Sequence, residues 1–237
     1  MSLSIAGKTV LVTGANRGLG RSLVDEALRR GAKGVYAASR QAMAVVDERV
    51  TPLILDVSDP AQVQEAADSV SSIDILINNA GVSVPNDLSD RSAFEQHLAV
   101  NLYGTLDVTR GFLASLTQTR GAVVNVVSLA AVAAVPVLPA YSVSKAAAFS
   151  MTQSLRARVA GQGVKVHAVL PGPVDTDMTR GVDIPKASAE SVALAIFDAV
   201  DNGEEEIFPD PASAPMAANW RDSAAKLLER QLAQART

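Results

Sequence analysis

Two side chains in the second half of the chain are spaced to exchange a proton. Tyr141 and Lys145 are four positions apart in a helical pattern, so they lie side by side on one helix face. A free tyrosine has a pKa of about 10, which is too high for ready proton exchange at pH 7. A neighbouring ammonium favours the phenolate, so we expect Lys145 to lower the pKa of Tyr141 toward the range of a general acid or base. Ser128, at the end of a predicted strand, is placed to donate a hydrogen bond to a substrate oxygen that gains charge.

A glycine-rich turn near the start of the chain is suited to binding an anion. Residues 13–20 read TGANRGLG and lie between the first predicted strand and the first predicted helix. Glycines at such a place let the backbone turn tightly and approach a pyrophosphate, while the helix N-terminus offers free N–H groups and a partial positive charge. The turn therefore predicts a dinucleotide site.

The elements that position these residues alternate short β-branched runs with helical patterns. Such alternation predicts parallel βαβ units, and near-continuous Val, Ile and Leu in the strands predicts a sheet covered on both faces. We expect an α/β fold, a single Rossmann-type doubly wound domain over 1–237 with a mostly parallel sheet of about seven strands. The expected strands are 8–13, 35–39, 50–57, 73–78, 122–128, 164–170 and 206–208. The expected helices are 18–30, one beginning at 59–60, then 89–100, 102–117, 141–160, 188–201 and 217–235.

The composition excludes several classes of protein. The chain has 237 residues, a net charge of -4, no cysteine and two histidines. Disulfide scaffolds and cysteine- or three-histidine-ligated metals are therefore excluded, and we expect no metal. Aromatic residues make up only 4% of the chain and basic residues are scattered, which argues against a nucleic-acid partner. We read no signal peptide at the start and expect a reducing, cytoplasmic setting.

One uncharged segment is long enough to span a bilayer. Residues 121–144 contain no charge over 24 positions. Pro136 and Pro139 interrupt the segment, Asn125 and Ser128 lie inside it, and its first half is a Val-rich run of strand length. We therefore interpret it as a buried strand, a loop and a helix start, and expect no membrane association.

Six motifs occur in an order that is typical of one enzyme family. They are TGANRGLG at 13–20, NNAG at 78–81, Asn101, Ser128, YSVSK at 141–145 and PGPVDT at 171–176. In these motifs the chain resembles the short-chain dehydrogenase/reductase family, from about residue 7 to 210. The resemblance implies an oxidoreductase that transfers hydride between a nicotinamide cofactor and a carbonyl or alcohol.

The resemblance also implies roles for individual residues. Tyr141 would protonate the alkoxide, Ser128 would polarise the carbonyl, Lys145 would contact the nicotinamide ribose and Asn101 would join a water-linked proton relay. Ser128 and Tyr141 would also bind the substrate. Asp56 and Val57 would flank the adenine, Asn78 and Ala80 would line the cofactor cleft, and Val174 and Thr176 would hold the carboxamide. The full set of expected cofactor residues is Gly14, Asn16, Arg17, Gly18, Leu19, Gly20, Ser39, Arg40, Asp56, Val57, Asn78, Ala80, Gly81, Tyr141, Lys145, Pro171, Gly172, Val174 and Thr176.

The residue after the second predicted strand indicates which nicotinamide cofactor is used. In dinucleotide folds an acidic residue about 20 positions past the glycines binds the ribose 2′-hydroxyl, whereas an Arg accommodates a 2′-phosphate. Arg40 follows Ser39 at this place, and no acidic residue lies between Val35 and Val46. A guanidinium binds phosphate bidentately, and Arg17 in the glycine turn supplies a second cation. We therefore expect NADP(H).

The loop between Ser128 and Tyr141 bears on the substrate. Residues 129–140 are apolar, uncharged and mostly small, and the segment where the family places a substrate lid, 177–187, is short. We infer an open apolar pocket, and NADPH-dependent reduction of a ketone or aldehyde as the favoured reaction. A 3-oxoacyl-carrier-protein reductase is the alternative enzyme, although the Gly- and Gln-containing stretch usual before the Tyr is PVLPA here. A dinucleotide-sensing protein without turnover, or a purely structural interaction protein, are alternatives from other classes.

Other expectations concern assembly and single residues. Family members are commonly homo-oligomers, so a tetramer or dimer is expected, and Leu102, Leu106, Phe112, Phe149 and Leu155 suit either a subunit surface or an internal core. Residues 209–237, with the single tryptophan, Trp220, depart from the family pattern and are expected to be helical. Glu204, Glu205 and Glu206 are interpreted as a solvated turn. His97 is expected to pack or lie at the surface, and His167 to lie in the core.

Overall fold

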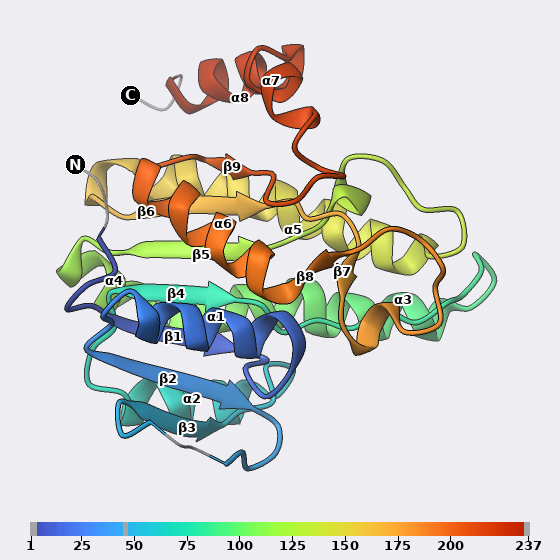
Figure 1. Ribbon diagram of the computed structural model, residues 1–237. Helices are drawn as coiled ribbons and strands as arrows, with labels where there is room; N and C mark the ends of the chain where they lie inside the picture. Colours follow the sequence, from blue (N-terminus) through green and yellow to red (C-terminus); the bar gives the residue numbers. More distant parts are fainter. Residues whose placement is uncertain (1–3, 45–46, 235–237) are drawn as a thin grey trace.

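One parallel sheet organises the chain (Figure 1). The computed structural model describes residues 4–44 and 47–234. In this part of the chain the main sheet has seven strands in the order β3-β2-β1-β4-β5-β6-β9, and every pairing in it is parallel. The strands are β1 (Thr9–Thr13), β2 (Gly34–Ser39), β3 (Val50–Ile54), β4 (Ile75–Asn78), β5 (Ala122–Val126), β6 (Lys165–Val169) and β9 (Glu206–Ile207). The predicted doubly wound, Rossmann-type fold is confirmed.

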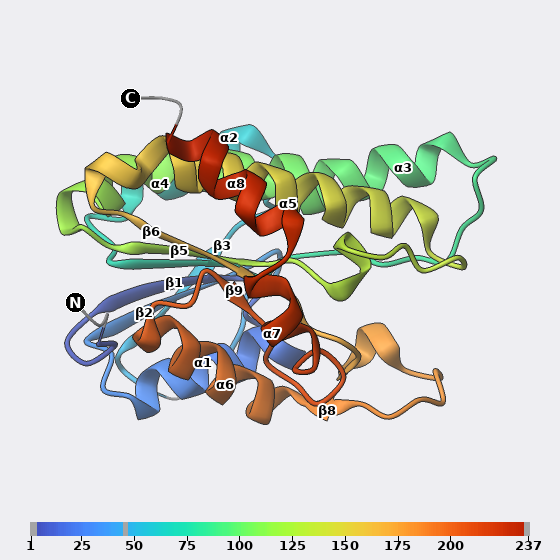
Figure 2. The ribbon, with the colours of Figure 1, turned by 90° about the horizontal axis from the view of Figure 1, so that it is seen from above.

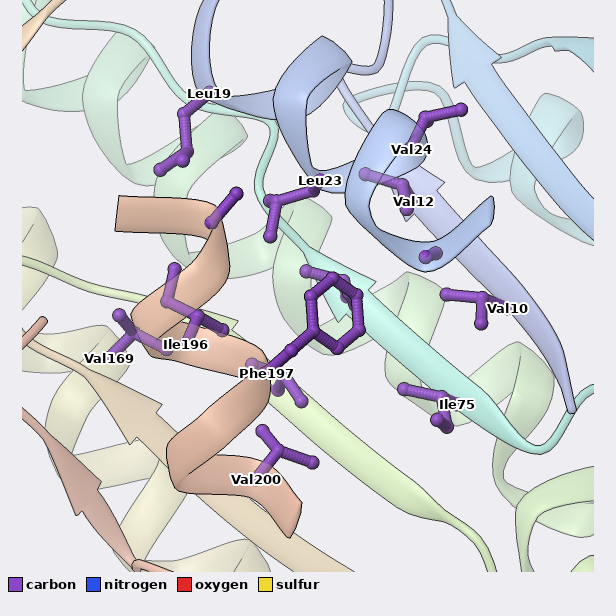
Figure 3. Close-up of a cluster of buried hydrophobic side chains, with 14 of the residues drawn as sticks. Val10, Val12, Leu19, Leu23, Val24, Ile75, Val169, Ile196, Phe197 and Val200 are labelled. Carbon is purple, nitrogen blue, oxygen red and sulfur yellow. The ribbon is translucent and has the colours of Figure 1, made fainter. Parts of the chain in front are cut away.

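Helices cover both faces of this sheet, as Figure 2 shows. On one face lie α1 (Gly18–Arg29) and α6 (Ala189–Asn202), and on the other α2 (Pro60–Ser69), α4 (Thr105–Thr119) and α5 (Pro139–Val159). The core on the first face joins Val10 and Val12 of β1 to Ile75 of β4, with Leu23 of α1 and Phe197 of α6 packed over them (Figure 3). Because these side chains are almost fully buried, they fix the helices that follow the strands relative to the sheet.

The chain between β4 and β5 forms one long helical stretch with a local widening, where a break was expected. It consists of α3 (Arg91–Leu98), a π-helix (Ala99–Gly104) and α4. The π-helix packs closely against Val57, since a Cβ at Gly104 would lie 2.7 Å from Val57 Cγ2. The helical stretch is continuous, so the expected gap at 101 is wrong, and Asn101 lies in the π-helix. Such turns are frequent at functional sites.

Two predicted strands end earlier than expected. The run 50–57 is a strand only to Ile54, although Leu55 N still donates to Ser39 O, and Asp56 N then donates to Gln62 Oε1 at 2.9 Å. The run 122–128 is a strand only to Val126, although Val127 N still donates to Val169 O, and Ser128 Oγ then accepts from Ala130 N at 3.1 Å. A second, two-stranded sheet was not predicted. It pairs β7 (Val174–Asp175) with β8 (Ala187–Ser188) and so closes the base of the segment 177–187.

The C-terminal extension forms two helices along the β9 edge of the sheet (Figures 1 and 2). They are α7 (Met216–Arg221) and α8 (Ala224–Gln234), whereas one helix over 217–235 was expected. The break occurs where Ser223 Oγ accepts from Lys226 N at 3.1 Å and caps α8. The expected end at Ala235 lies outside the described residues. Trp220 packs edge-on against Phe149 of α5, with ring centroids 5.4 Å apart.

The interpretation of residues 204–206 as a solvated turn is wrong for Glu206. Its side chain is 5% exposed and lies 2.9 Å from Lys226 Nζ and 2.8 Å from Arg156 Nη1. Glu205 also pairs with Lys226, at 2.7 Å. Sequence pattern alone could not reveal this, because the two cations lie on α5 and α8, far along the chain.

The five apolar residues that suit either a subunit surface or an internal core differ in their burial. Phe112 and Phe149 are buried within the chain, while Leu102, Leu106 and Leu155 are partly exposed. Oligomerisation stays a prediction. Among the described residues, no helix is both long and apolar enough to cross a membrane.

Candidate active site

A cleft of about 620 Å³ opens at the carboxyl ends of the central strands. Its walls come from the glycine turn, the ends of β2, β4 and β5, the start of α5 and the chain after β6. Ligand clefts in open parallel sheets lie at this edge. Of the residues expected to bind cofactor or substrate, every one lies on the cleft wall except Asn78.

Ser128, Tyr141 and Lys145 meet on one side of the cleft. Ser128 and Tyr141 both lie on the cleft wall, and Lys145 Nζ lies 5.8 Å from the centre of the Tyr141 ring. Lys145 is buried, and its ammonium donates to Val126 O at 2.9 Å, which fixes the side chain beneath the tyrosine. The spacing of four along α5 thus places both groups on one face, as predicted.

Burial dominates the electrostatics of this trio. It raises the pKa of Tyr141 above its usual value, an effect that the nearby Ser128 hydroxyl opposes. Burial also lowers the pKa of Lys145 to about 8. The expected net lowering of the Tyr141 pKa is therefore wrong, because burial outweighs the neighbouring ammonium. The phenol is held in its protonated form, which is the form that donates a proton.

Asn101 does not line the cleft but supports the wall behind it. Its Oδ1 accepts from Val82 N at 2.9 Å, and its Nδ2 donates to Val82 O and to Ser144 Oγ. Both polar atoms of the amide are thus already bonded, so this side chain orders the loop after β4. A proton relay through Asn101 would need its main-chain carbonyl, which accepts from Thr105 Oγ1 at 3.0 Å.

The glycine turn forms a cradle suited to a pyrophosphate. Gly14 and Gly18 adopt positive φ values of 66° and 51°. A Cβ at Gly20 would lie 2.0 Å from Gly14 O, so only glycine fits there. The N-terminus of α1 has no side-chain cap and no acidic residue in its first turn, which leaves its N–H groups and positive dipole facing the cleft. These residues fit a dinucleotide.

The two arginines expected at the 2′-phosphate take different positions. Arg40 is exposed on the cleft wall, and among the described residues it forms no salt bridge. Arg17 is paired with Asp177 at 2.6 Å, across from the glycine turn. Hydrogen bonding to Arg17 lowers the pKa of Asp177. Arg40 is therefore available to pair with a phosphate, whereas Arg17 forms a salt bridge to the segment 177–187.

Asn78 was expected to line the cofactor cleft, but Asn79 lies there instead. Asn78 is buried and donates to Thr109 Oγ1 and Asn125 Oδ1, so its side chain faces the sheet interior. Asn79 lies on the cleft wall and donates to Thr13 O at 2.9 Å. The signal available in the sequence was alternation along the strand, because consecutive residues point to opposite faces.

A histidine that the sequence left unassigned contacts the candidate tyrosine. His97 is fully buried, Nε2 accepts from Val84 N at 3.1 Å, and Nδ1 lies 2.6 Å from Ala93 O. Its ring meets the Tyr141 ring edge-on, with centroids 6.3 Å apart. Asn86, on the same loop as Val84, accepts through Oδ1 from Ala140 N at the start of α5. The side chains of His97 and Asn86 thus bind the loop after β4 to α3 and α5. His167, expected in the core, is buried in β6.

A buried carboxylate joins the C-terminal extension to the chain after β6. Asp210 Oδ2 accepts from Gly172 N and Ser213 Oγ, both at 2.8 Å. Its Oδ1 accepts from Ala212 N and Ser213 N. This contact could not be predicted from local patterns, because residues 172 and 210 are far apart along the chain.

Asp210→Asn is expected to weaken NADPH binding about tenfold. An amide would point an N–H group at neighbours that are all donors, which displaces Gly172 from the cleft wall. A fluorescence titration with NADPH checks this. Asp175→Asn, at an exposed position on the same loop, is the control and should change the dissociation constant less than twofold. Equal effects of the two substitutions would contradict the role given to Asp210.

Comparison with known proteins agrees with this geometry. A family model described as short chain dehydrogenase matches residues 8–186. Ketoacyl reductase HetN from Nostoc sp. is 34% identical over 227 residues, covering 86% of this chain and 79% of the relative. Sorbitol dehydrogenase from Cereibacter sphaeroides is 31% identical over 203 residues, covering 80% and 79%.

Similarity in structure extends over almost the whole chain. A short chain dehydrogenase from Burkholderia cenocepacia, crystallised in complex with NADP, superimposes with a TM-score of 0.88 at 36% identity. The match covers 97% of this chain and 99% of that one. Among residues 4–44 and 47–234, no group of three potential ligands is arranged to hold a metal ion. The motif order, the sheet and these matches together place the chain in the short-chain dehydrogenase/reductase family of oxidoreductases, to which it belongs.

Proposed function

We propose that the protein is an NADPH-dependent carbonyl reductase that converts a ketone or aldehyde to an alcohol, reversibly. One observation carries the proposal. The hydroxyl-bearing side chains of Ser128 and Tyr141, with Lys145 buried beside them, lie on the same cleft as the uncapped glycine turn. A proton donor and a dinucleotide cradle then face one substrate volume.

The proposed mechanism assigns one task to each side chain. When bound, the nicotinamide supplies a hydride to the carbonyl carbon. The Ser128 hydroxyl donates a hydrogen bond to the carbonyl oxygen as negative charge develops there. Tyr141 transfers its phenolic proton to that oxygen, so the product gains one hydride and one proton. The nearby Lys145 ammonium stabilises the phenolate that remains.

The alternatives are separated by a substrate panel. Relatives of similar identity carry the names ketoacyl reductase and sorbitol dehydrogenase, so the substrate must be sought in the site itself. We propose to follow NADPH absorbance with ketones, aldehydes and acetoacetyl thioesters. Turnover of simple carbonyls supports the proposal, and turnover of thioesters alone would favour the 3-oxoacyl reductase. NADPH binding with no turnover of any of them would favour a dinucleotide-sensing protein.

NADPH is expected to bind at least about tenfold more tightly than NADH, and Arg40→Ala should remove this preference. The exposed guanidinium at the end of β2 is placed to pair with a 2′-phosphate, and NADH lacks that group. Binding of both cofactors is measured by titration at fixed ionic strength, because screening weakens the contact. Arg110→Ala, at an exposed position on α4, is the matched control and should leave both constants unchanged. An unaltered NADPH constant in Arg40→Ala would refute the assignment.

A further inference from the structure

Three loops at the mouth of the cleft concentrate exposed apolar side chains. They are residues 82–90, 129–139 and 177–187, and they follow the adjacent strands β4, β5 and β6. Half of the strongly exposed large apolar side chains among the described residues lie on these short loops. The most exposed on each are Leu88 (79%), Val137 (68%) and Met178 (50%). We call the three loops the apolar rim.

The loops of the apolar rim face one another across the end of the sheet. In Figure 1 all three extend beyond the carboxyl ends of the strands. In Figure 2 the first two lie on the α3 side of the sheet and the third lies beside β8 on the other side. Val82 and Met178, one from each side, line the cleft that also holds Ser128 and Tyr141. The rim is therefore continuous with the candidate catalytic groups.

The charged side chains of the rim are mostly bonded within the protein. Arg180 pairs with Asp177, and Lys186 Nζ donates to Thr179 O at 2.8 Å. Asp87 accepts from Ser89, Asp90 accepts from Ser92 Oγ, and residues 129–139 contain no charge. The remaining charged residue, Asp183, is acidic and exposed. The rim thus offers no free cation to a carboxylate or phosphate.

We propose that the apolar rim binds the aliphatic tail of the substrate, so the protein reduces medium- to long-chain alkyl ketones or aldehydes. This inference rests on the proposed function and adds the substrate class. The carbonyl lies at Ser128 and Tyr141, and the tail runs outward between the 129–139 and 177–187 loops. A contiguous exposed apolar surface at the mouth of a site is typical of a surface that is covered on binding. An uncharged alkyl chain fits both the aliphatic side chains and the lack of a free cation.

A chain-length series tests the inference. With NADPH, kcat/KM is expected to rise two- to fourfold, roughly, for each methylene from 2-butanone to 2-octanone. A carboxylate at the far end of the longest substrate should abolish the gain, because the charge would be desolvated without a partner. Titration of the NADP⁺ complex with the same ketones gives a second readout that does not need turnover.

Matched variants locate the effect. Val137→Asp and Val182→Asp, one on each side of the rim, are expected to flatten the series and to lower kcat/KM for 2-octanone about tenfold, with 2-butanone little changed. Leu194→Asp, at an exposed position on α6 outside the rim, should leave the series unaltered. Turnover that is independent of chain length would overturn the inference and leave the proposed function standing. Binding that depends on chain length, without turnover, would overturn the proposed function and support the apolar rim as the site of the tail. If neither turnover nor binding depends on chain length, the inference is overturned.

Discussion

Tyr141→Phe is expected to lower kcat/KM for NADPH-dependent carbonyl reduction about a thousandfold, within the range of general acid contributions. The substitution removes one oxygen, which is the only polar atom of this side chain and the proposed proton donor. The ring stays, so its packing against His97 and beneath the cleft is retained. NADPH should still bind with a dissociation constant within about threefold of the parent.

Steady-state rates and an NADPH titration together check this result. Tyr103→Phe, at an exposed tyrosine in the π-helix, is the matched control and should keep full activity. A Tyr141→Phe rate within a few-fold of the parent, with both variants folded, would show that another group delivers the proton. A parallel loss of NADPH binding would show instead that the hydroxyl serves the cofactor.

The pH profile gives an independent view of the same trio. Burial raises the pKa of Tyr141, so the proton donor persists through neutral pH, while the pKa of Lys145 lies at about 8. Reduction should therefore be nearly constant from about pH 6 to 7.5 and fall as the pH rises past Lys145, when the ammonium that stabilises the phenolate is lost. Alcohol oxidation requires the phenolate and should rise with pH. A reduction rate that increases above pH 8 would contradict the assignment.

The features that could be predicted from the sequence depend on residues that are close together along the chain. Apolar strand runs alternate with helical runs, and this alternation determines the order of the elements. The i,i+4 spacing of Tyr141 and Lys145 needs only one helix to bring the pair together. The glycine turn likewise depends on backbone geometry within a few residues, as the positive φ of Gly14 and Gly18 shows. Such features were placed correctly to within a few residues.

The features that were missed depend on residues far apart in the chain. Asp210 holds Gly172, and Glu206 meets Lys226, only after the sheet has formed. The pKa of Tyr141 was misjudged for a related reason. The helix gives the distance to Lys145, but burial is a property of the whole fold, and here it outweighs the neighbouring charge. Arg17 shows the same limit, since its partner Asp177 lies 160 positions further along.

Lys226→Met is expected to lower the free energy of unfolding by about 3 kcal/mol, because it removes a buried cation from between buried carboxylates. Lys226 is 3% exposed and contacts Glu205, Glu206 and Glu229 within 3.0 Å. Arg156 still pairs with Glu206 and Glu229, but Glu205 loses its salt bridge to Lys226. Urea-induced unfolding measures the loss, and Lys33→Met, at an exposed lysine, should change it by less than about 0.5 kcal/mol.

The effect should depend on pH in a defined direction. Burial lowers the pKa of Lys226, but hydrogen bonding to Glu205 and Glu206 outweighs this, and the net pKa is raised. The contribution of the ammonium is therefore complete at neutral pH and is lost only above the ordinary lysine range. The pKa of Glu205 is lowered, so the carboxylate side of the cluster weakens as the pH falls. The cost of Lys226→Met should accordingly shrink in acid, when Glu205 takes up a proton.

Trp220 allows the site of the damage to be observed directly. It is the single tryptophan, and it lies on α7 against Phe149 of α5, so its fluorescence reports the docking of the extension. In Lys226→Met the fluorescence transition should move to lower urea than the circular dichroism transition, because α8 has lost its ion pairs to Glu205 and Glu206. Coincident transitions at the parent midpoint would show that the ion pairs contribute little, and that apolar contacts such as the one between Trp220 and Phe149 hold the extension.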